Sequence, residues 1–437
     1  MERWESKQSK IREFIIKHNQ ICGIDFGTSN SALASSCMNS MGNIELINLE
    51  QGKSTIPTGV FFDFEDWAIF FGREGFEKYI DGHPGRLLRS LKSVLGSKLM
   101  NENTQIGHDK YAFSEIIGFF VAHIKRTAEL STRSSFEHTV VGRPVYFVDG
   151  DPIADRRAEG ELKDIFIQQG FKDVSFEFEP IAAARDYESR IDKEELVLIM
   201  DIGGGTSDFS LIRLSPQSRN KQDRAGDIIA NSGIHIGGTD LDKQFSLACV
   251  MPEMGRGSLT IDGRLMPPND YNTLTTWHEI NSLYKKKTRV EISKLYNLSS
   301  RKDRVKRLVK TVERQRGHEL ANAVELAKIC LSNTGARNID LDFIEDDWLI
   351  KVTQKQLLTA IAQQIHKVME AAKNTVISGA GMDVSQIKTV FMTGGSIGLP
   401  VFESQVRATF PNAKVIQGDH FSSVATGLGM CALQRYG

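Results

Sequence analysis

The stretch DIGGGTSDFSL, from Asp201 to Leu211, contains three consecutive glycines, which are separated from the acid Asp201 by one residue. An apolar run at 196–200 precedes it, which is typical of a short buried strand. Polar and apolar residues alternate over 207–211, which favours a second strand. Glycine lets backbone N–H groups approach a ligand closely, and successive N–H groups in a tight turn form a concavity that binds anions. The pattern predicts strand, phosphate-sized loop, strand, and a plain glycine-rich hairpin is the alternative.

A second stretch repeats this pattern near the start of the chain. The apolar residues 21–24 lead into Asp25-Phe-Gly-Thr-Ser-Asn30, and another alternating segment follows. A repeat at this distance predicts two similar lobes whose loops converge on one polyphosphate. The carboxylates of Asp25 and Asp201 would then suit Mg²⁺, which prefers oxygen ligands. A P-loop is excluded because no Gly-Lys-Ser/Thr follows the glycines, and a dinucleotide fingerprint is excluded because they open a hairpin, not a helix.

Composition limits the classes of function. The 437 residues suffice for two lobes with substantial cores. A net charge of −1 gives no general argument for nucleic acid or a membrane surface, and we expect neither as a partner. No apolar run approaches the length of a membrane span, and the charged first twenty residues do not resemble a secretory signal. The cysteines have no paired spacing, so we expect reduced thiols in a cytoplasmic protein; they are Cys22, Cys37, Cys249, Cys330 and Cys431.

Strand and helix patterns alternate along the chain, as in a layered α/β protein. Thr353 and Gln356 form a capping-box pattern at the start of a long amphipathic helix. The other expected elements are a strand meander over 21–62, helices over 113–131, 151–169 and 180–190, strands over 138–142, 174–178 and 387–392, and two short helices that close the chain.

Three parts follow from this pattern. Residues 1–20 form an N-terminal extension with one short amphipathic helix, 21–194 form lobe I, and 195–437 form lobe II. Lobe II includes a basic helical subdomain at about 240–335. Within it, residues 285–316 hold thirteen Lys and Arg against three acids. Such a run predicts a solvated helical arm, and docking of an acidic protein is the alternative.

Seven motifs together resemble one family, the ATPase domain shared by 70-kDa heat-shock proteins, actin and sugar kinases. The resemblance is strongest to the heat-shock branch, and it spans residues 21–430 in family order. It implies an actin-like ATPase fold, with two ribonuclease-H-like lobes around a central nucleotide cleft. The motifs are IDFGTSNS (24–31), LKSVLG (91–96), GRPVYF (142–147), EPIAAARDYE (179–188), DIGGGTSDFSL (201–211), IGGTDLD (236–242) and TGGSIGLP (393–400).

The resemblance implies a role for each site residue, with ATP or ADP and Mg²⁺ as cofactors. Asp25 and Asp201 would hold Mg²⁺, and Lys92 would stabilise the transferred phosphoryl group. Either Asp201 or Asp208 would accept the proton of the attacking water. The implied catalytic residues are Lys92, Glu179, Asp201, Thr206 and Asp208. The implied nucleotide-binding residues are Gly27, Thr28, Ser29, Asn30, Gly203, Gly204, Gly205, Thr206, Gly237, Gly238, Glu325, Lys328, Gly394, Gly395 and Ser396.

The motifs also imply a coupling between the site and the outer surface, through Pro144 with Arg156 or Arg157. Two positions depart from the family pattern. Ile329 stands where the family has an arginine that stacks on adenine, which leaves the choice of base open. Asn30 replaces an aromatic residue.

Three functions are compatible with the sequence. The first is a heat-shock-type ATPase with weak Mg-dependent hydrolysis, which acts as a nucleotide-dependent switch and chaperone-like regulator. The second is a small-molecule kinase of the sugar type, and the third is an actin-like filament protein. For the first we expect a monomer that acts on a protein partner, such as an exchange factor, a co-chaperone or a client complex. The short C-terminus resembles bacterial chaperone-like proteins of the YegD type, so we expect no peptide-binding domain of its own.

Overall fold

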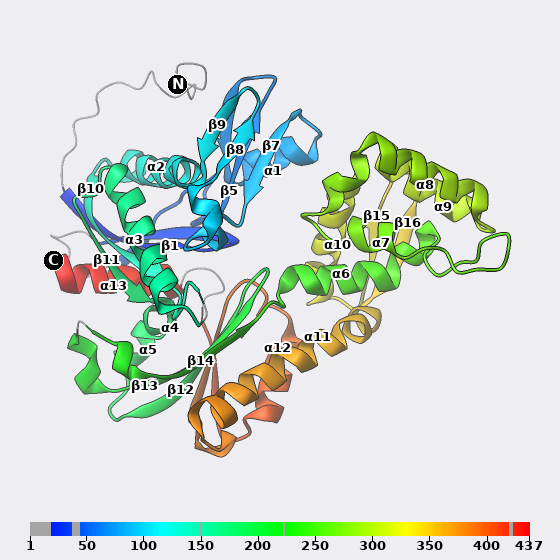
Figure 1. Cartoon of the computed structure of the whole chain (residues 1–437). Coiled ribbons are helices and arrows are strands. Elements are labelled where there is room, and N and C mark those ends of the chain that lie inside the picture. Colours follow the sequence, from blue (N-terminus) through cyan, green and yellow to red (C-terminus); the bar gives the residue numbers. More distant parts are fainter. Residues whose placement is uncertain (1–18, 37–43, 149, 222, 419–422) are drawn as a thin grey trace.

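Two mixed β-sheets form the centres of two lobes in the computed structural model (Figure 1). The structure describes residues 19–36, 44–148, 150–221, 223–418 and 423–437. The expected N-terminal helix and Cys37 lie outside the described residues. The α/β fold class predicted from the sequence is confirmed.

The sheet of lobe I has the strand order β11-β10-β1-β2-β3, with β4 also paired to β2. β1 is antiparallel to β2 and parallel to β10, so it occupies the middle of the sheet. Its residues Cys22, Ile24 and Phe26 are buried, as expected for the apolar run in the sequence. The strands are β1 (Asn19–Phe26), β2 (Asn30–Ser36), β3 (Ile44–Leu46), β4 (Thr55–Pro57), β10 (Ser135–Arg143) and β11 (Asp173–Phe178).

The sheet of lobe II repeats this topology. Its order is β18-β17-β12-β13-β14, with β12 antiparallel to β13 and parallel to β17. β12 and β13 therefore occupy the places that β1 and β2 have in lobe I, and each glycine-containing loop connects the first two strands of its sheet. The strands are β12 (Glu195–Ile202), β13 (Ser207–Leu214), β14 (Ile228–Ile234), β17 (Thr389–Thr393) and β18 (Lys414–Gln417).

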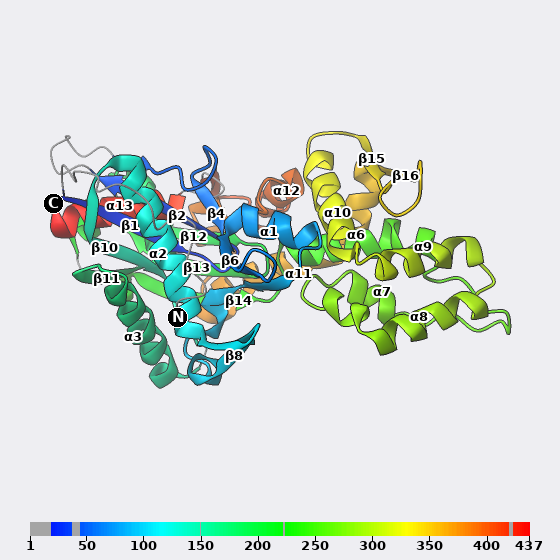
Figure 2. The same ribbon diagram turned by 90° about the horizontal axis from the view of Figure 1, so that it is seen from above.

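Helices cover the sheets and fill the space between them (Figures 1 and 2). α2 (Phe113–Thr132) and α3 (Pro152–Gln168) pack on lobe I, close to their predicted ranges. α6 (Gly238–Cys249), α11 (Gln354–Asn374) and α12 (Pro400–Thr409) pack on lobe II. The capping box is present, since Thr353 Oγ1 accepts from the Gln356 amide at 3.3 Å and Gln356 Oε1 accepts from the Thr353 amide at 2.9 Å. The helix expected at 180–190 is two short pieces, α4 (Glu179–Ala183) and α5 (Arg185–Glu188).

The C-terminal helix α13 (Ser423–Tyr436) packs against the sheet of lobe I, although the chain reaches it from lobe II. Its Leu428 shares one apolar cluster with Ile21 and Val140 of lobe I and Val197 of lobe II. Glycines permit the close approach: a Cβ atom on Gly427 would collide with the carbonyl of Ala182, and one on Gly23 would collide with the Gly429 amide. A boundary between residues 194 and 195 therefore divides the sequence into lobes, but it assigns α13 to lobe II although this helix packs on the sheet of lobe I.

Each lobe carries an outer part. That of lobe I consists of β5 (Gly59–Asp63), β6 (Ala68–Phe71), α1 (Gly72–Ile80), β7 (Gly85–Arg89), β8 (Asn103–Ile106) and β9 (Asp109–Ala112). That of lobe II consists of α7 (Asn269–Leu274), α8 (Lys286–Leu298), α9 (Lys302–Glu313), α10 (Gly317–Leu331), β15 (Ala336–Asp340) and β16 (Leu349–Thr353).

The basic run at 285–316 forms α8 and α9, which are not a free solvated arm. Ile292, Leu308 and Val312 belong to the core of lobe II, and Val305 is buried as well. Only the outward faces of these helices are basic and solvated, because amphipathic helices bury their apolar stripe. None of the helices in the described part of the chain has the length and apolar character needed to cross a membrane.

Candidate functional site

The two glycine-containing loops face each other between the lobes. The loop of lobe I runs from Gly27 to Ser29 and that of lobe II from Gly203 to Thr206. A Cβ atom added to Gly204 would lie only 2.7 Å from Ser29 Oγ, so the loops touch at this point. A Cβ atom on Gly27 would collide with the carbonyl oxygen of Asn30. Glycine is therefore needed for each loop to turn and for the two to meet.

The loops present backbone donors that the protein itself does not use. Gly203 N–H bonds to the Thr206 carbonyl at 2.9 Å and closes the second loop. Within the described residues, the amides of Thr28, Ser29, Gly204, Gly205 and Thr206 have no acceptor. Unpaired N–H groups at a tight turn attract an anion. The arrangement supports the predicted phosphate cradle.

Acidic side chains gather beside these loops. Asp25 and Asp201 each lie one residue before the end of their strands, β1 and β12. Burial and the neighbouring charge of Glu179 raise the pKa of Asp25 to about 7. Burial, and then the charge of Asp208, raise the pKa of Asp201 to about 8. The two equivalent strands thus carry acids into one electrostatically coupled cluster.

Lys92 is the cation of this cluster. Its Nζ forms an ion pair with Glu179 Oε1, and its charge opposes the raised pKa values of Asp25 and Asp201. Its side chain is 9% exposed, so it is not a surface lysine. One ammonium group cannot neutralise three or four carboxylates, and like charges at short range disfavour ionisation. The residues present therefore fit a hydrated divalent cation, held by Asp25 and Asp201 with Glu179 behind them.

The turn that carries Lys92 is fixed by helix α3. Lys92 lies in a short 3₁₀ helix (Leu91–Val94), and Gly96 follows it. Gly96 N–H donates to Glu161 Oε2 at 2.9 Å, and Arg157 donates to the Gly96 carbonyl. Of the two arginines proposed to couple the site to the surface, Arg157 is thus the one in contact with the lysine turn.

Arg143, the last residue of β10, makes a second link between α3 and the segment that leads to Pro144. The sequence analysis missed this link. Arg143 pairs with Asp155 at 2.8 Å and with Glu159, and it donates to the Pro144 carbonyl at 3.1 Å. Its position directly before the proline was the only signal available.

The segments expected around the nucleoside close against the second loop. Gly203 O accepts from Gly238 N–H at 3.0 Å and from Ser396 Oγ at 2.9 Å. Gly394 has φ of +94°, and a Cβ atom there would collide with Asp201 Oδ1. The structure therefore brings Gly237, Gly238, Gly394, Gly395 and Ser396 to the loop Gly203–Thr206.

Lys328 and Glu325 lie on the same face of α10, but they have different surroundings. Lys328 is buried and pairs with Asp242 at 2.9 Å, so it holds the segment 237–242 to the helix. Burial raises the pKa of Asp242 to about 6 although Lys328 lowers it. Glu325 and Ile329 are exposed. Asp242 is a site residue that sequence analysis missed, although it ends the quoted motif IGGTDLD.

Thr206 and Asp208 lie side by side at the start of β13. Thr206 Oγ1 is 3.0 Å from Asp208 Oδ2, and Asp208 stands opposite Asp201 in the strand register. Asp208 is exposed and Asp201 is half-buried. Both carboxylates are thus placed to accept a proton near the loops.

An aromatic cluster joins the outer parts of the two lobes. His318 of α10 stacks edge-on against Tyr79 of α1 and against Trp277, with ring centroids 4.7 Å apart in each case. Its Nε2 lies 3.4 Å from the Tyr79 hydroxyl and 3.2 Å from the Trp277 carbonyl. The guanidinium of Arg89 stacks over Trp277 at 4.9 Å. α1 and α10 therefore touch across the gap between the lobes (Figures 1 and 2).

The His318 contact should weaken in mild acid. Burial lowers the pKa of His318 to about 4, and the charge of Arg89 adds to this. The folded pKa lies below the unfolded value, so the stabilisation is complete above about pH 6.5 and is lost as the pH falls toward 4. Between pH 7 and pH 5, the protonation of His318 should lower the free energy of unfolding by about 2 kcal/mol.

Urea unfolding at pH 7 and pH 5 checks this prediction. His123, whose pKa burial also lowers to about 4, makes a comparable contribution inside lobe I. For each of His318→Gln and His123→Gln, the change in unfolding free energy from pH 7 to pH 5 should be more favourable than in the unaltered chain by about 2 kcal/mol. An unchanged pH dependence in His318→Gln would contradict it.

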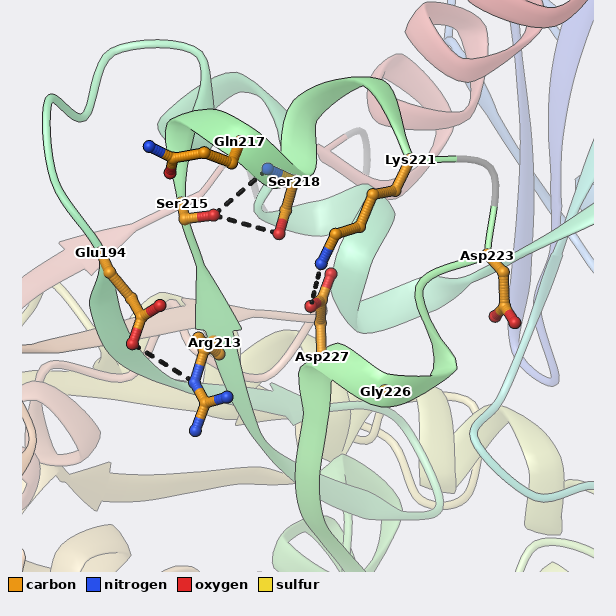
Figure 3. A pocket seen from close by; sticks show the side chains of 9 residues that line it. All are labelled: Glu194, Arg213, Ser215, Gln217, Ser218, Lys221, Asp223, Gly226 and Asp227. Atoms are coloured by element: carbon orange, nitrogen blue, oxygen red, sulfur yellow. Dashed lines mark hydrogen bonds and ion pairs between the residues drawn. The ribbon is translucent and has the colours of Figure 1, made fainter.

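A polar pocket of about 440 Å³ lies at the other end of the sheet of lobe II (Figure 3). Four of its five charged side chains pair with each other, Arg213 with Glu194 at 3.4 Å and Lys221 with Asp227 at 3.1 Å, and Asp223 accepts from the Ala225 amide. Leu214 and Ser207 are at opposite ends of β13, so the pocket is about 20 Å from the loop at Gly203. Since it holds no free donor cluster, we do not assign the function to it.

Comparison with known proteins agrees with this geometry. The sequence model of the family described as Hsp70 protein matches residues 21–251 and 298–434. The chaperone protein DnaK of Thermosipho melanesiensis is 32% identical over 230 residues, 52% of this chain and 35% of the relative. DnaK of Thermotoga maritima is 30% identical over the same length, and DnaK of Ureaplasma urealyticum serovar 10 is 26% identical over 402 residues, 89% of this chain and 54% of the relative. The chain spans between a third and about half of the length of these relatives.

Proposed function

The chain belongs to the Hsp70 protein family, and we propose that it is a Mg-dependent ATPase that works as a nucleotide-controlled switch between its two lobes. Its fold is the actin-like ATPase fold of that family. The observation that carries the proposal is the pair of facing loops, whose N–H groups are unpaired within the described residues, beside a carboxylate cluster that contains Lys92. This arrangement binds a polyphosphate and a divalent cation together.

In this proposal the loops bind the phosphates and the acids hold the cation. The amides of Thr28 and Ser29 bind from lobe I, and those of Gly204, Gly205 and Thr206 bind from lobe II. Asp25 and Asp201 would hold hydrated Mg²⁺, which neutralises phosphate charge when it is bound. Gly142 leaves room for Glu179, since a Cβ atom there would lie 3.2 Å from Glu179 Cγ.

The reaction needs positioning and charge neutralisation more than covalent chemistry. Lys92, fixed by Glu179 and by the turn on α3, would stabilise the γ-phosphoryl group and orient the attacking water. Asp208 or Asp201 would take the proton of that water. Gly237, Gly238, Glu325, Gly394, Gly395 and Ser396 would surround the nucleoside, with Lys328 holding the segment at 237–242.

The nucleotide bridges residues of both lobes, so binding should favour the closed arrangement. A ligand shifts such an equilibrium only by its different affinity for the two states. We propose that a protein partner responds to this change and that the chain works as a monomer in the cytoplasm. The activities that the longer relatives owe to the rest of their chains are not assigned to this one.

Mg-ATP and Mg-ADP should raise the unfolding temperature of the chain, because a ligand that binds only the folded state stabilises it by mass action. At about 100 times the dissociation constant the gain is about 2.7 kcal/mol. A thermal melt with millimolar nucleotide measures it. Gly204→Val should abolish the shift because its side chain would displace Ser29, whereas Gly160→Val, which faces open space on α3, should keep it.

No thermal shift with either nucleotide would contradict the proposal. Phosphorylation of an added sugar would favour the kinase instead, and nucleotide-dependent pelleting would favour the filament protein.

A further inference from the structure

Five large apolar side chains lie exposed at the outer end of lobe II, and we call them the tip patch. They are Leu259, Ile261, Leu265, Val290 and Leu298, with exposed fractions of 47%, 71%, 69%, 50% and 50%. Single exposed apolar residues are ordinary, but several that gather on one surface indicate an interaction site.

Backbone contacts bring four of these residues together, and Val290 lies on the face of α8 that ends at Leu298. Leu259 and Leu265 form a β-bridge, so their side chains share a face, and Ile261 lies in the turn that connects them. The amide of Ile261 donates to the Leu298 carbonyl at 2.8 Å, which joins the hairpin to the end of α8. Figures 1 and 2 show this segment, between α6 and α7, at the outer ends of α8 and α9.

The outward side chains are not needed to hold the hairpin in place. Thr260, Met266 and Ser299 are buried beneath it. Thr260 Oγ1 bonds to the Arg264 carbonyl at 2.9 Å, and the Ser300 amide bonds to the Leu259 carbonyl at 3.0 Å. The fold therefore anchors the hairpin through its inner residues and leaves the apolar ones in solvent.

Positive charges alternate with the apolar residues along α8. Lys287, Val290, Lys294 and Leu298 follow each other at helical spacing, and all four are exposed. Within the described residues, Lys287 and Lys294 form no ion pair, whereas Arg304 and Arg307 of α9 turn toward Glu253 and Glu345.

The acids near the patch are mostly paired. Arg264 pairs with Asp262 and Arg301 pairs with Asp303 at 2.7 Å. Glu291 is the remaining exposed acid of this face of α8. The surface as a whole is apolar and basic.

Most of the tip patch lies outside the residues that the family model matches, and it is not part of the nucleotide site. The family model matches up to residue 251 and again from 298, and four of the five apolar residues lie between these limits. The proposed ATPase does not use them, because its residues lie between the lobes.

We propose that the tip patch docks an acidic amphipathic helix of a partner protein. Val290 and Leu298 would take apolar side chains of that helix, and Lys287 and Lys294 would pair with acids spaced three or four residues apart. A membrane surface is disfavoured because it requires the apolar and basic residues on separate faces, and on α8 they alternate. Single-stranded nucleic acid is disfavoured because the exposed apolar residues are aliphatic and offer no ring for stacking.

Fluorescence anisotropy with a labelled peptide tests the proposal on the full chain. The probe is an amphipathic helix of about 20 residues with Leu on one face and Glu on the other, and the comparison is its Lys analogue. We expect the acidic peptide to bind with a dissociation constant of about 10–100 μM at low salt and more weakly at high salt. Ile261→Asp with Leu265→Asp should weaken binding at least about tenfold, as should Lys287→Glu with Lys294→Glu.

Matched changes on α3, Ile167→Asp and Lys163→Glu, alter exposed residues of the same types and should leave binding unchanged. Each variant should keep its thermal shift with Mg-ATP, which shows that it is folded and separates failure here from failure of the ATPase proposal. Equal binding of the Lys analogue, or no binding of the acidic peptide, would overturn the proposal. Binding to phosphatidylserine vesicles in place of the peptide would also overturn it.

Discussion

Lys92→Ala should slow ATP hydrolysis by about two orders of magnitude or more, which is the scale of losing one preorganised electrostatic group. The ammonium group of Lys92 is buried against Glu179, and it is the cation among the acids beside the loops. Its loss removes positive charge where the transferred phosphoryl group would lie. The backbone amides of both loops remain, so the affinity for Mg-ATP should fall much less than the rate.

Single-turnover hydrolysis and nucleotide binding, both measured at saturating Mg²⁺, separate these effects. Lys98→Ala serves as the control, because Lys98 is exposed and six residues further along the same segment. Equal losses of rate and affinity in Lys92→Ala would show that Lys92 is a binding or structural residue and not a catalytic one.

The sequence was sufficient to predict the centre of the molecule. An apolar strand, an acid and a glycine loop occur twice, and the structure places them at equivalent positions of two similar sheets. Backbone physics makes this possible, because only glycine permits the turn at Gly27 and the contact at Gly204. Local patterns of this kind depend on few long-range contacts.

The contacts between distant segments could not be predicted in the same way. The glycines of α13 can be read from the sequence, but no sequence pattern near Gly427 indicates that Ala182 is its neighbour. Lys328 was expected beside the nucleoside, and its buried pairing with Asp242, 86 residues away, gives it a structural task as well. The partner of a charged residue depends on tertiary packing, which periodicity does not encode.

Arg224 is the strongest example of such a hidden role. The surrounding residues, NKQDRAGD (220–227), have the composition of a solvated loop. In the structure its side chain is fully buried, and it donates to both oxygens of Glu188, at 2.7 and 3.0 Å, and to Asp227 at 2.5 Å. Glu188 ends α5, and α4 just before it begins with the site residue Glu179. The network thus fastens the β13–β14 connection to the segment that follows the site.

Arg224→Leu should lower the free energy of unfolding by about 3–5 kcal/mol, because it leaves the buried carboxylate of Glu188 with only the longer pairing to Arg185 at 3.7 Å. The side chain of Glu188 is only 1% exposed, so water cannot replace the guanidinium. Urea unfolding at pH 7 measures the change. Lys221→Leu is the matched control: Lys221 also pairs with Asp227 but is 50% exposed, and such a pair contributes less than about 1 kcal/mol.

A second change tests the cause of this loss. Glu188→Gln added to Arg224→Leu removes the buried negative charge, so the double variant should recover part of the stability that the single variant loses. If the double variant is less stable than Arg224→Leu by the full effect of Glu188→Gln alone, the two residues act independently. The stabilisation by Arg224 would then come from its packing and not from its charge.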